Sequence, residues 1–178
     1  MVNINDFAGN YVLDQGHSEI GFVARHAMIT KVRGEFTDYD ADFTVDENGD
    51  HSLRAVIKSD SVTTGSADRD GHLKSADFFD VGNYPEITFV AKNSTFVAQH
   101  GVVTGELTIK GITKVVDLDV EVFGQETDPF GNVRLGFEAN TEINRKDFNI
   151  DWNAPLNTGG VLVSEKITIN IEGSAIKQ

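Results

Sequence analysis

Three side chains near the middle of the chain have the types and spacing that chemistry requires. Arg69, Asp70 and His72 lie within four consecutive positions. A carboxylate beside an imidazole can tune its basicity, and a guanidinium binds phosphate oxygens in a bidentate manner. The group could therefore hydrolyse a small lipid ester or phosphate, or contact an anionic headgroup. We favour a structural role, in which Asp70 belongs to the first turn of a helix and Arg69 either forms an ion pair or bonds a carbonyl at a strand end.

Other signals for catalysis or metal binding are weak. The histidines follow no zinc-ligand spacing, and the chain has no cysteine that could complete a metal site or act as a nucleophile. The sequence shows no nucleophile with a paired base and no phosphate-binding loop. We therefore predict no metal, no cofactor and no catalytic residue. The histidines are His17, His26, His51, His72 and His100.

The charge balance limits the partners. Lys and Arg total 15 against 28 Asp and Glu, which gives a net charge of −13. Such a field repels a phosphate backbone, so we expect no nucleic acid partner. No apolar run approaches the length of a membrane span, and the N-terminal residues MVNINDFAGN lack the basic start and apolar stretch of a secretory signal. The sequence therefore favours a cytoplasmic location.

The elements that must position these side chains are predicted to be β-strands. Apolar and polar residues alternate with a period of two in eight segments, which is typical of antiparallel strands with one dry face. The apolar faces are Ile20, Phe22 and Ala24; Tyr39, Ala41, Phe43 and Val45; Leu53, Ala55 and Ile57; Ile87, Phe89 and Ala91; Val103, Gly105, Leu107 and Ile109; Val116, Leu118, Val120 and Val122; Val133, Leu135, Phe137, Ala139 and Thr141; and Ile167, Ile169 and Ile171.

Turn residues between these segments predict short connections. The turn signals are Asn48-Gly49, His100-Gly101, Lys110-Gly111 and residues 128–132. Strands that are neighbours in the sequence should therefore pair in an up-and-down meander. About eight strands with one dry face each can close into a barrel or stack as two sheets. We expect an all-β antiparallel barrel, because closure removes exposed strand edges. The sequence shows no linker or repeat, so residues 1–178 are expected to form a single domain.

Two stretches lack the alternation. Between Thr64 and Val81, Ser66 is a suitable N-cap and acidic residues follow it, which predicts a short helical insertion over about residues 66–80. We expect it to fold over the barrel. The second stretch, residues 144–160, contains Trp152 and a glycine pair. It is expected to be a long loop in which Trp152 packs at a barrel end.

The interior of such a barrel can serve two purposes. Eight strands enclose a space that their own side chains can fill or that can hold one small ligand. The inward residues are aliphatic and aromatic, with Ala24, Ala91, Gly105 and Ala139 among the larger ones. An apolar cavity would favour an apolar guest by about 0.8 kcal/mol per buried methylene. The residue pattern alone leaves a hollow carrier and a solid barrel equally open.

Several segments resemble the YceI-like family of lipid- or polyisoprenoid-binding proteins. They occur in the family's order and cover most of the chain: residues 14–26, 32–36, 57–89, 105–118 and 136–148. The most specific part is RDGHLKSADFFD, from Arg69 to Asp80, followed by Tyr84-Pro85. The resemblance implies an extended lipocalin-like barrel whose tunnel takes a long isoprenoid chain or a similar amphiphile. Many relatives are periplasmic and carry a cleavable signal, from which this sequence departs.

The sequence and the resemblance together lead to a defined hypothesis. The protein is expected to bind, transport or store a long apolar lipid, polyprenyl or quinone-like, without catalysis. The helical insertion would act as a lid, with Phe78 and Phe79 touching the ligand. At the opening, His26, Arg69 and His72 are candidates for contact with a headgroup, although for His26 a bond to a backbone carbonyl is favoured. The predicted lining residues are Phe22, Phe89, Leu107, Leu118, Val120, Phe137, Ile167 and Ile169.

Two alternatives stay open at this point. One is a hydrolase that uses Arg69, Asp70 and His72. The other is a stress-related interaction module built on a solid barrel. A homodimer is compatible with each of these functions.

Overall fold

The computed structural model describes residues 3–48 and 51–178. Within these residues the chain forms eleven strands, one α-helix and four short 3-10 helices. The strands are β1 (Gly9–Leu13), β2 (Glu19–His26), β3 (Thr30–Phe36), β4 (Tyr39–Val45), β5 (His51–Lys58), β6 (Val62–Thr63), β7 (Glu86–Val97), β8 (His100–Ile109), β9 (Ile112–Thr127), β10 (Val133–Asn144) and β11 (Lys166–Lys177). The helices are α1 (Ala67–Lys74), η1 (Ile4–Phe7), η2 (Gln15–His17), η3 (Ser59–Ser61) and η4 (Arg145–Phe148).

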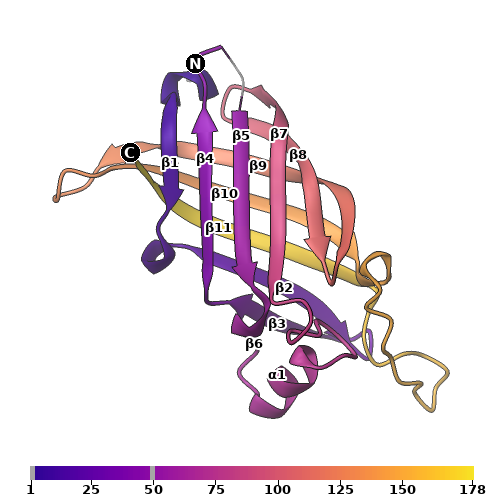
Figure 1. Ribbon diagram of the computed structural model, residues 1–178. Helices are drawn as coiled ribbons and strands as arrows, with labels where there is room; N and C mark the ends of the chain where they lie inside the picture. Colours follow the sequence, from indigo (N-terminus) through magenta and orange to yellow (C-terminus); the bar gives the residue numbers. More distant parts are fainter. Residues whose placement is uncertain (1–2, 49–50) are drawn as a thin grey trace.

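Eight of the strands close into an antiparallel barrel. Their order is β1-β4-β5-β7-β8-β9-β10-β11, and β1 pairs with β11 from Tyr11↔Lys177 to Leu13↔Ala175. In Figure 1, β4, β5 and β7 run upright in front, and β9, β10 and β11 cross behind them. The predicted all-β, lipocalin-like barrel with a short helical insertion is therefore confirmed. Closure pairs each of these eight strands on both sides, which removes the exposed edges of the barrel.

The N-terminal strands depart from a simple meander. One side of β11 pairs with two strands, because Ala175–Lys177 faces β1 and Thr168–Glu172 faces β2. A 3-10 turn, η2, carries the chain past the end of β1, so that β2 takes the next place along β11. From β2 the sheet continues into β3 and β6 below the ring (Figure 1). Among the predicted strands, the expected pairing of sequential neighbours is correct for β4 with β5, for β5 with β7 and onward to β11. It is wrong for β2 and β4, because β1, which the alternation did not predict, takes the place beside β4.

Of the predicted turns, two are correct and one is wrong, and the turn predicted at Asn48-Gly49 extends outside the described residues. Lys110 and Gly111 connect β8 to β9 with positive φ angles of 52° and 77°. Residues 128–132 connect β9 to β10. His100 and Gly101 instead lie inside β8, and the turn falls earlier, where Ala98 has φ of 57°. Gly101 belongs to the strand, where the ring of its cross-strand partner Phe96 covers it.

The helical insertion begins as expected and ends early. The Ser66 hydroxyl accepts a hydrogen bond from the Arg69 backbone N–H at 3.4 Å and caps α1. The expected extent of about residues 66–80 is too long, because α1 ends at Lys74. The amide and the hydroxyl of Ser75 both donate to the His72 carbonyl, at 3.1 and 2.6 Å, and extended backbone at Ser75 stops the helix. Residues 76–83 continue as turns, and we call residues 66–80 the lid.

Asp128 organises the β9–β10 loop. Its carboxylate accepts hydrogen bonds from the backbone N–H groups of Phe130 at 2.8 Å and Asn132 at 3.0 Å. It also accepts a bond from Arg134 Nε at 2.7 Å, and Arg134 Nη1 bonds Asp14 Oδ2 at 2.8 Å. The Arg134 guanidinium, followed by these backbone donors, lowers the pKa of Asp128 to about 2. One arginine therefore ties this loop to the end of β1.

This pair makes stability depend on acid in a defined range. Because the pKa of Asp128 is lowered on folding, its stabilisation is present above about pH 4 and is lost as the pH falls toward 2. We predict that Arg134→Gln raises the Asp128 pKa in an NMR titration. We also predict that the difference in unfolding free energy between wild type and variant shrinks between pH 5 and pH 2. Lys92→Gln, at an exposed position, is the control. An Asp128 pKa that is the same in both proteins would contradict the assignment.

Candidate functional site

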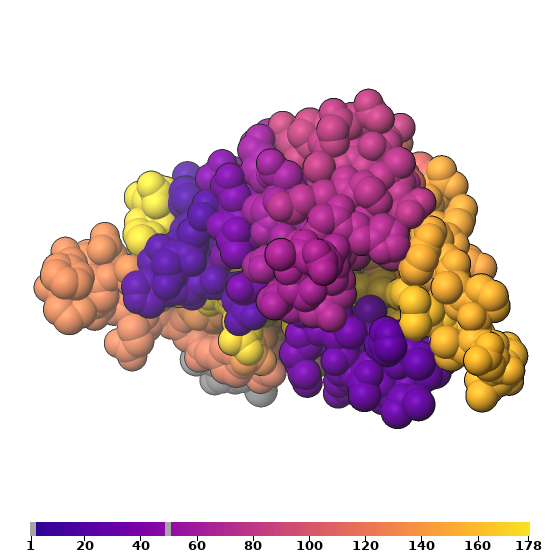
Figure 2. Space-filling view, turned by 90° about the horizontal axis from the view of Figure 1, so that it is seen from below, coloured from indigo at the N-terminus to yellow at the C-terminus, as the bar shows by residue number. Residues whose placement is uncertain are grey.

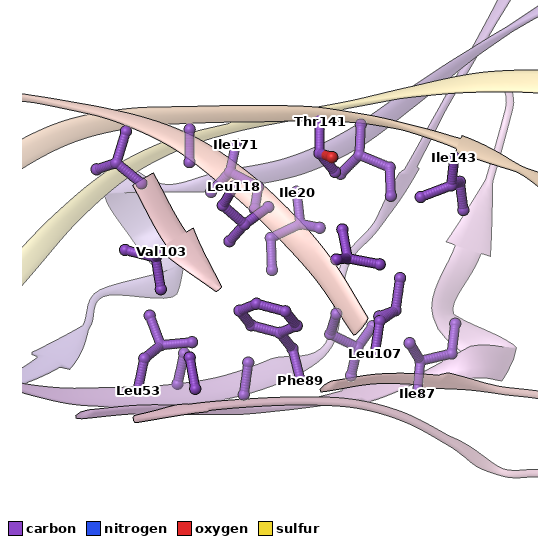
Figure 3. Close-up of a pocket in the computed structure, with 18 of the residues that line it drawn as sticks. Ile20, Leu53, Ile87, Phe89, Val103, Leu107, Leu118, Thr141, Ile143 and Ile171 are labelled. Atoms are coloured by element: carbon purple, nitrogen blue, oxygen red, sulfur yellow. The ribbon is translucent and has the colours of Figure 1, made fainter. Parts of the chain in front are cut away.

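The barrel is hollow. A cavity of about 270 Å³ lies between the inward faces of the strands, and almost all of its wall is apolar carbon. In Figure 3, side chains from opposite walls, among them Leu53, Phe89 and Leu118, point into one space. Along β10 the wall runs from Leu135 to Ile143, about 27 Å of strand. A small volume that extends along so long a wall has the shape of a narrow channel. The alternative of a barrel filled by its own side chains is therefore wrong.

Four phenylalanines of the wall lie against glycines on neighbouring strands. A Cβ placed on any of these glycines would come within 2.3 to 2.6 Å of the phenylalanine ring, so each ring occupies the space that a side chain would take. The rings therefore lie close to the backbone of the neighbouring strand. Without the glycines they would have to tilt toward the axis and occupy the channel. The pairs are Phe22 with Gly34, Phe89 with Gly105, Phe96 with Gly101, and Phe137 with Gly173.

The lid covers one end of the cavity. Leu73, Phe78 and Phe79 line it from α1 and the turns that follow. The Phe79 ring meets the Phe36 ring edge-on at 5.6 Å, and Phe36 lies 5.7 Å from Phe22, so the lid packs on β3 through aromatic contacts. Figure 2 views this end from below, where the magenta lid segment, the purple β2–β3 hairpin and the orange loop after β10 surround a hollow.

Trp152 joins the loop after β10 to the lid. Its ring lies 4.6 Å from the His72 ring and 5.5 Å from the Phe78 ring. The expected position at a barrel end is therefore confirmed. Since this is the chain's single tryptophan, its fluorescence reports on the lid end of the cavity.

Arg145 holds the loop after β10 in place. It is 3% exposed, and its guanidinium donates to the carbonyls of Ser164, Ile150, Trp152 and Val163 at 2.7 to 3.2 Å. Burial lowers the pKa of Arg145. Its hydrogen bonds satisfy carbonyls that no strand partner reaches, which explains how an irregular loop closes the cavity end. The sequence pattern does not single out this arginine.

A β-bulge turns one polar side chain into the far end of the cavity. In β7 the register shifts between Ala91 and Asn93, so that Ser94 pairs with the inward-facing Val103. Bulges commonly re-aim side chains in this way. The Ser94 side chain is among those that line the cavity. Its hydroxyl oxygen is buried and has no hydrogen-bond partner among the described residues. His51 lines the same end, and its ring lies 6.0 Å from that of Phe96.

Ten of the thirteen predicted site residues line the cavity, and their contact with a ligand stays a prediction. They come from six strands and the lid, and the channel brings them together because each strand places its alternate residues on one inner wall. The sequence did not single out Phe96, which shares their wall, or Leu73. The ten are Phe22, Phe78, Phe79, Phe89, Leu107, Leu118, Val120, Phe137, Ile167 and Ile169.

The other three predicted residues lie outside the cavity wall. His26 is exposed at the end of β2, where its backbone bridges to Val163, so it is not an inward-facing core histidine. Arg69 donates from Nε to the Thr64 hydroxyl at 2.7 Å and from Nη2 to the Thr64 carbonyl at 2.8 Å. His72 Nε2 lies 2.9 Å from Asp77 Oδ2. The side chains of Arg69 and His72 therefore have structural partners at the lid, whereas the bridge of His26 is made by its backbone.

Asp70 is also engaged in structure. Its Oδ1 accepts bonds from the backbone N–H and the hydroxyl of Thr64 at 2.8 and 2.6 Å, and these bonds hold the pKa of Asp70 below its usual value. Within the described residues, Arg69 and Asp70 bind the same threonine and His72 bonds a different carboxylate. This arrangement confirms the structural role that we favoured for Arg69 and Asp70.

Charge is nearly absent from the channel. Among the described lining residues Arg145 is the one charged side chain, and its donors already bond carbonyls. In residues 3–48 and 51–178 no group of three His, Asp or Glu side chains could hold a metal ion. No helix in this part of the chain is long and apolar enough to cross a membrane.

Comparison with known proteins agrees with this architecture. The model of the YceI-like domain matches residues 11–175. The chain belongs to the YceI-like family. Protein YceI of Escherichia coli O157:H7 is 40% identical over 150 residues, which cover 80% of this chain and 77% of that protein.

Two solved structures show the same fold. The YCEI protein of Campylobacter jejuni has 34% sequence identity and a TM-score of 0.74, with 86% of this chain and 90% of that chain covered. A polyisoprenoid binding domain from Saccharophagus degradans has a TM-score of 0.72 and 15% identity, with 96% and 99% covered. Both structures therefore share the fold of this chain.

The segment that most specifically resembles the YceI-like family, Arg69 to Asp80, forms most of the lid. In the segment from Arg69 to Asp80, Asp70 anchors the helix to Thr64 and Ser75 ends the helix. Phe78 and Phe79 then reach the cavity wall. This segment therefore specifies how one end of the channel is closed, and its charged residues serve this closure.

We predict that Gly173→Ala narrows the channel. The new Cβ would lie 2.4 Å from Phe137 Cζ, so the ring must move toward the cavity. Overpacking of this kind costs about 1–3 kcal/mol of unfolding free energy, and the uptake of a bulky-chain probe should fall. Denaturant unfolding and a binding titration measure the two effects. Gly136→Ala is the matched control, since its Cβ meets nothing within 4 Å. Equal uptake and stability in both variants would disprove the role of the glycine.

Proposed function

We propose that the protein is a non-enzymatic carrier or store of a long, uncharged isoprenoid-type lipid, such as a prenylated quinone. The observation that carries the proposal is the narrow apolar channel of about 270 Å³ through a closed barrel. Each methylene buried in it contributes roughly 0.8 kcal/mol, so chain length dominates affinity. The family membership supports lipid binding. The polyisoprenoid-binding domain of S. degradans shares the fold.

The channel chemistry favours an uncharged ligand over a prenyl phosphate. A buried phosphate needs cationic or multiple hydrogen-bond partners. Among the described lining residues the one cation, Arg145, donates to backbone carbonyls. A carbonyl or hydroxyl oxygen needs a single donor, and the Ser94 hydroxyl supplies one at the far end of the channel. A quinone oxygen fits this site.

The hydrolase alternative has no supporting geometry. Arg69, Asp70 and His72 lie outside the cavity wall, and each is bonded to a structural partner. A lipid inside the channel would not meet them.

We predict that Leu107→Trp blocks the channel. Leu107 is 7% exposed and faces the cavity, so an indole in its place fills the path of the chain. Uptake of a prenylated benzoquinone, followed by native mass spectrometry, should fall at least tenfold, the equivalent of about 1.4 kcal/mol. Val102→Trp, on the outward side of the same strand, is the control and should bind as wild type does. Undiminished uptake by a folded Leu107→Trp protein would refute the carrier.

We predict that Ser94→Ala distinguishes a polar oxygen from plain hydrocarbon. Loss of one neutral hydrogen bond costs about 0.5–1.5 kcal/mol. The variant should therefore bind the quinone several-fold more weakly. Its affinity for an unsubstituted polyprenyl hydrocarbon should equal that of wild type. Parallel titrations of both ligands measure this difference. If a prenyl phosphate binds wild type more tightly than the quinone does, the proposal that the ligand is uncharged is wrong. The proposal that the protein carries a lipid would still hold.

A further inference from the structure

The β2–β3 turn and the loop after β10 form one projecting unit. The backbone N–H of Ala27 donates to the Leu162 carbonyl at 2.7 Å, and that of Ser164 donates to the Arg25 carbonyl at 3.0 Å. The loop also closes on itself, because Pro155 and Val161 bridge and Leu156 N–H donates to the Gly160 carbonyl at 2.8 Å. We call residues 27–29 and 155–162 the tip. In Figure 2 its purple and orange parts share one corner of the molecule.

The tip exposes apolar side chains. Met28 is 58% exposed, Ile29 76% and Val161 39%. Residues 152–164 contain no charged side chain. Single exposed apolar residues elsewhere, such as Phe130, are ordinary on a protein surface. A group of them on one projection marks an interaction surface.

Basic residues surround this apolar group. Arg25, Lys31 and Arg33 are on the two strands that lead to the turn, and no Asp or Glu occurs from residue 20 to residue 34. None of the three cations forms an ion pair within the described residues. In a protein with a net charge of −13 this is a local reversal of sign. It fits an anionic partner.

The turn itself does not require apolar residues. Ala27 and Met28 have φ of 51° and 61°, and Ile29 N–H donates to the His26 carbonyl at 3.0 Å. Two left-handed residues in a tight hairpin turn favour Asn-Gly, which is polar. The alanine and methionine are therefore held at a conformational cost. Their replacement by Asn-Gly would keep the turn and remove the apolar side chain.

The tip adjoins the cavity. Ala24 on β2 and Val163 after the loop both line the channel, and each lies within three residues of the tip in sequence. The lid on the other side of the hollow carries charges of both signs, among them Asp68, Lys74 and Asp77. The basic and apolar face is thus confined to the hairpin and the loop.

We propose that the tip docks on the anionic surface of a lipid bilayer. Met28, Ile29 and Val161 enter the headgroup layer, and Arg25, Lys31 and Arg33 lie over anionic headgroups, the combination by which peripheral proteins hold membranes. Docking brings the lid end of the channel to the lipid. An amphiphile presents its polar end at the bilayer surface, so that end enters first and reaches Ser94. This adds a place of ligand exchange to the proposed carrier function.

The full-length protein is tested by co-sedimentation with vesicles of equal parts phosphatidylglycerol and phosphatidylcholine, and with phosphatidylcholine alone. We expect binding to the anionic vesicles that weakens as salt rises. The triple variant R25Q/K31Q/R33Q should bind about 100-fold more weakly, since each basic residue near an anionic surface contributes roughly fivefold. A second variant, A27N/M28G with I29T, keeps the turn and should also lose most of the binding.

Two matched controls separate the tip from general effects. K92Q/K114Q/K177Q changes the net charge equally at exposed sites on other strands, and F130S removes an exposed phenylalanine from the β9–β10 loop. Both should sediment as wild type does. Docking is refuted if the wild-type protein does not co-sediment with the anionic vesicles. It is also refuted if the tip variants bind these vesicles as tightly as the control variants do.

A further measurement keeps the two proposals apart. Uptake of the prenylated quinone from detergent micelles, followed by Trp152 fluorescence, does not need a bilayer. The tip variants should take up the quinone from micelles as wild type does and acquire it from vesicles more slowly. A protein that docks but never takes up the quinone disproves the carrier alone, and one that takes it up without docking disproves the tip alone.

Discussion

Close packing of phenylalanine rings against glycines is the interaction on which the rest of the structure depends. An eight-strand barrel has an interior that its own side chains can just fill. Here Phe22, Phe89, Phe96 and Phe137 each lie over a glycine of a neighbouring strand, so large apolar residues cover the wall without occupying the axis. The wall is therefore well packed and the centre is open. A channel of about 270 Å³ follows from this arrangement.

The two ends of that channel are chemically different. At the lid end, aromatic contacts and the buried guanidinium of Arg145 order segments that have no strand partners. At the far end, the β7 bulge adds one hydroxyl, that of Ser94, to an apolar wall. A ligand with a long chain and one small polar group matches both ends. The apolar and basic tip beside the lid end is the proposed contact with the membrane that holds such a ligand.

Much of the fold and part of the site were predictable because alternation has a period of two. Leu107, Leu118 and Ile169 could be assigned to an inner wall, since every second residue of an antiparallel strand faces the same side. The same rule failed where the backbone changes register. Ser94 follows a β-bulge that no residue type in the sequence indicates. The alternation therefore did not predict that Ser94 lines the cavity. His26 continues an inward face but reaches the strand end, where solvent replaces the wall.

The sequence by itself determined eight of the eleven strands, the cap of the lid helix, the apolar character of the interior and the family, because these depend on local residue types and spacing. The alternation did not predict β1, β3 or β6. Only the tertiary structure decided that the barrel is hollow, since this depends on which glycine lies across from which ring. It also decided the role of Arg145, whose carbonyl partners come from residues up to 19 positions away. Such contacts depend on strand register and chain closure, and pairing between distant segments sets both.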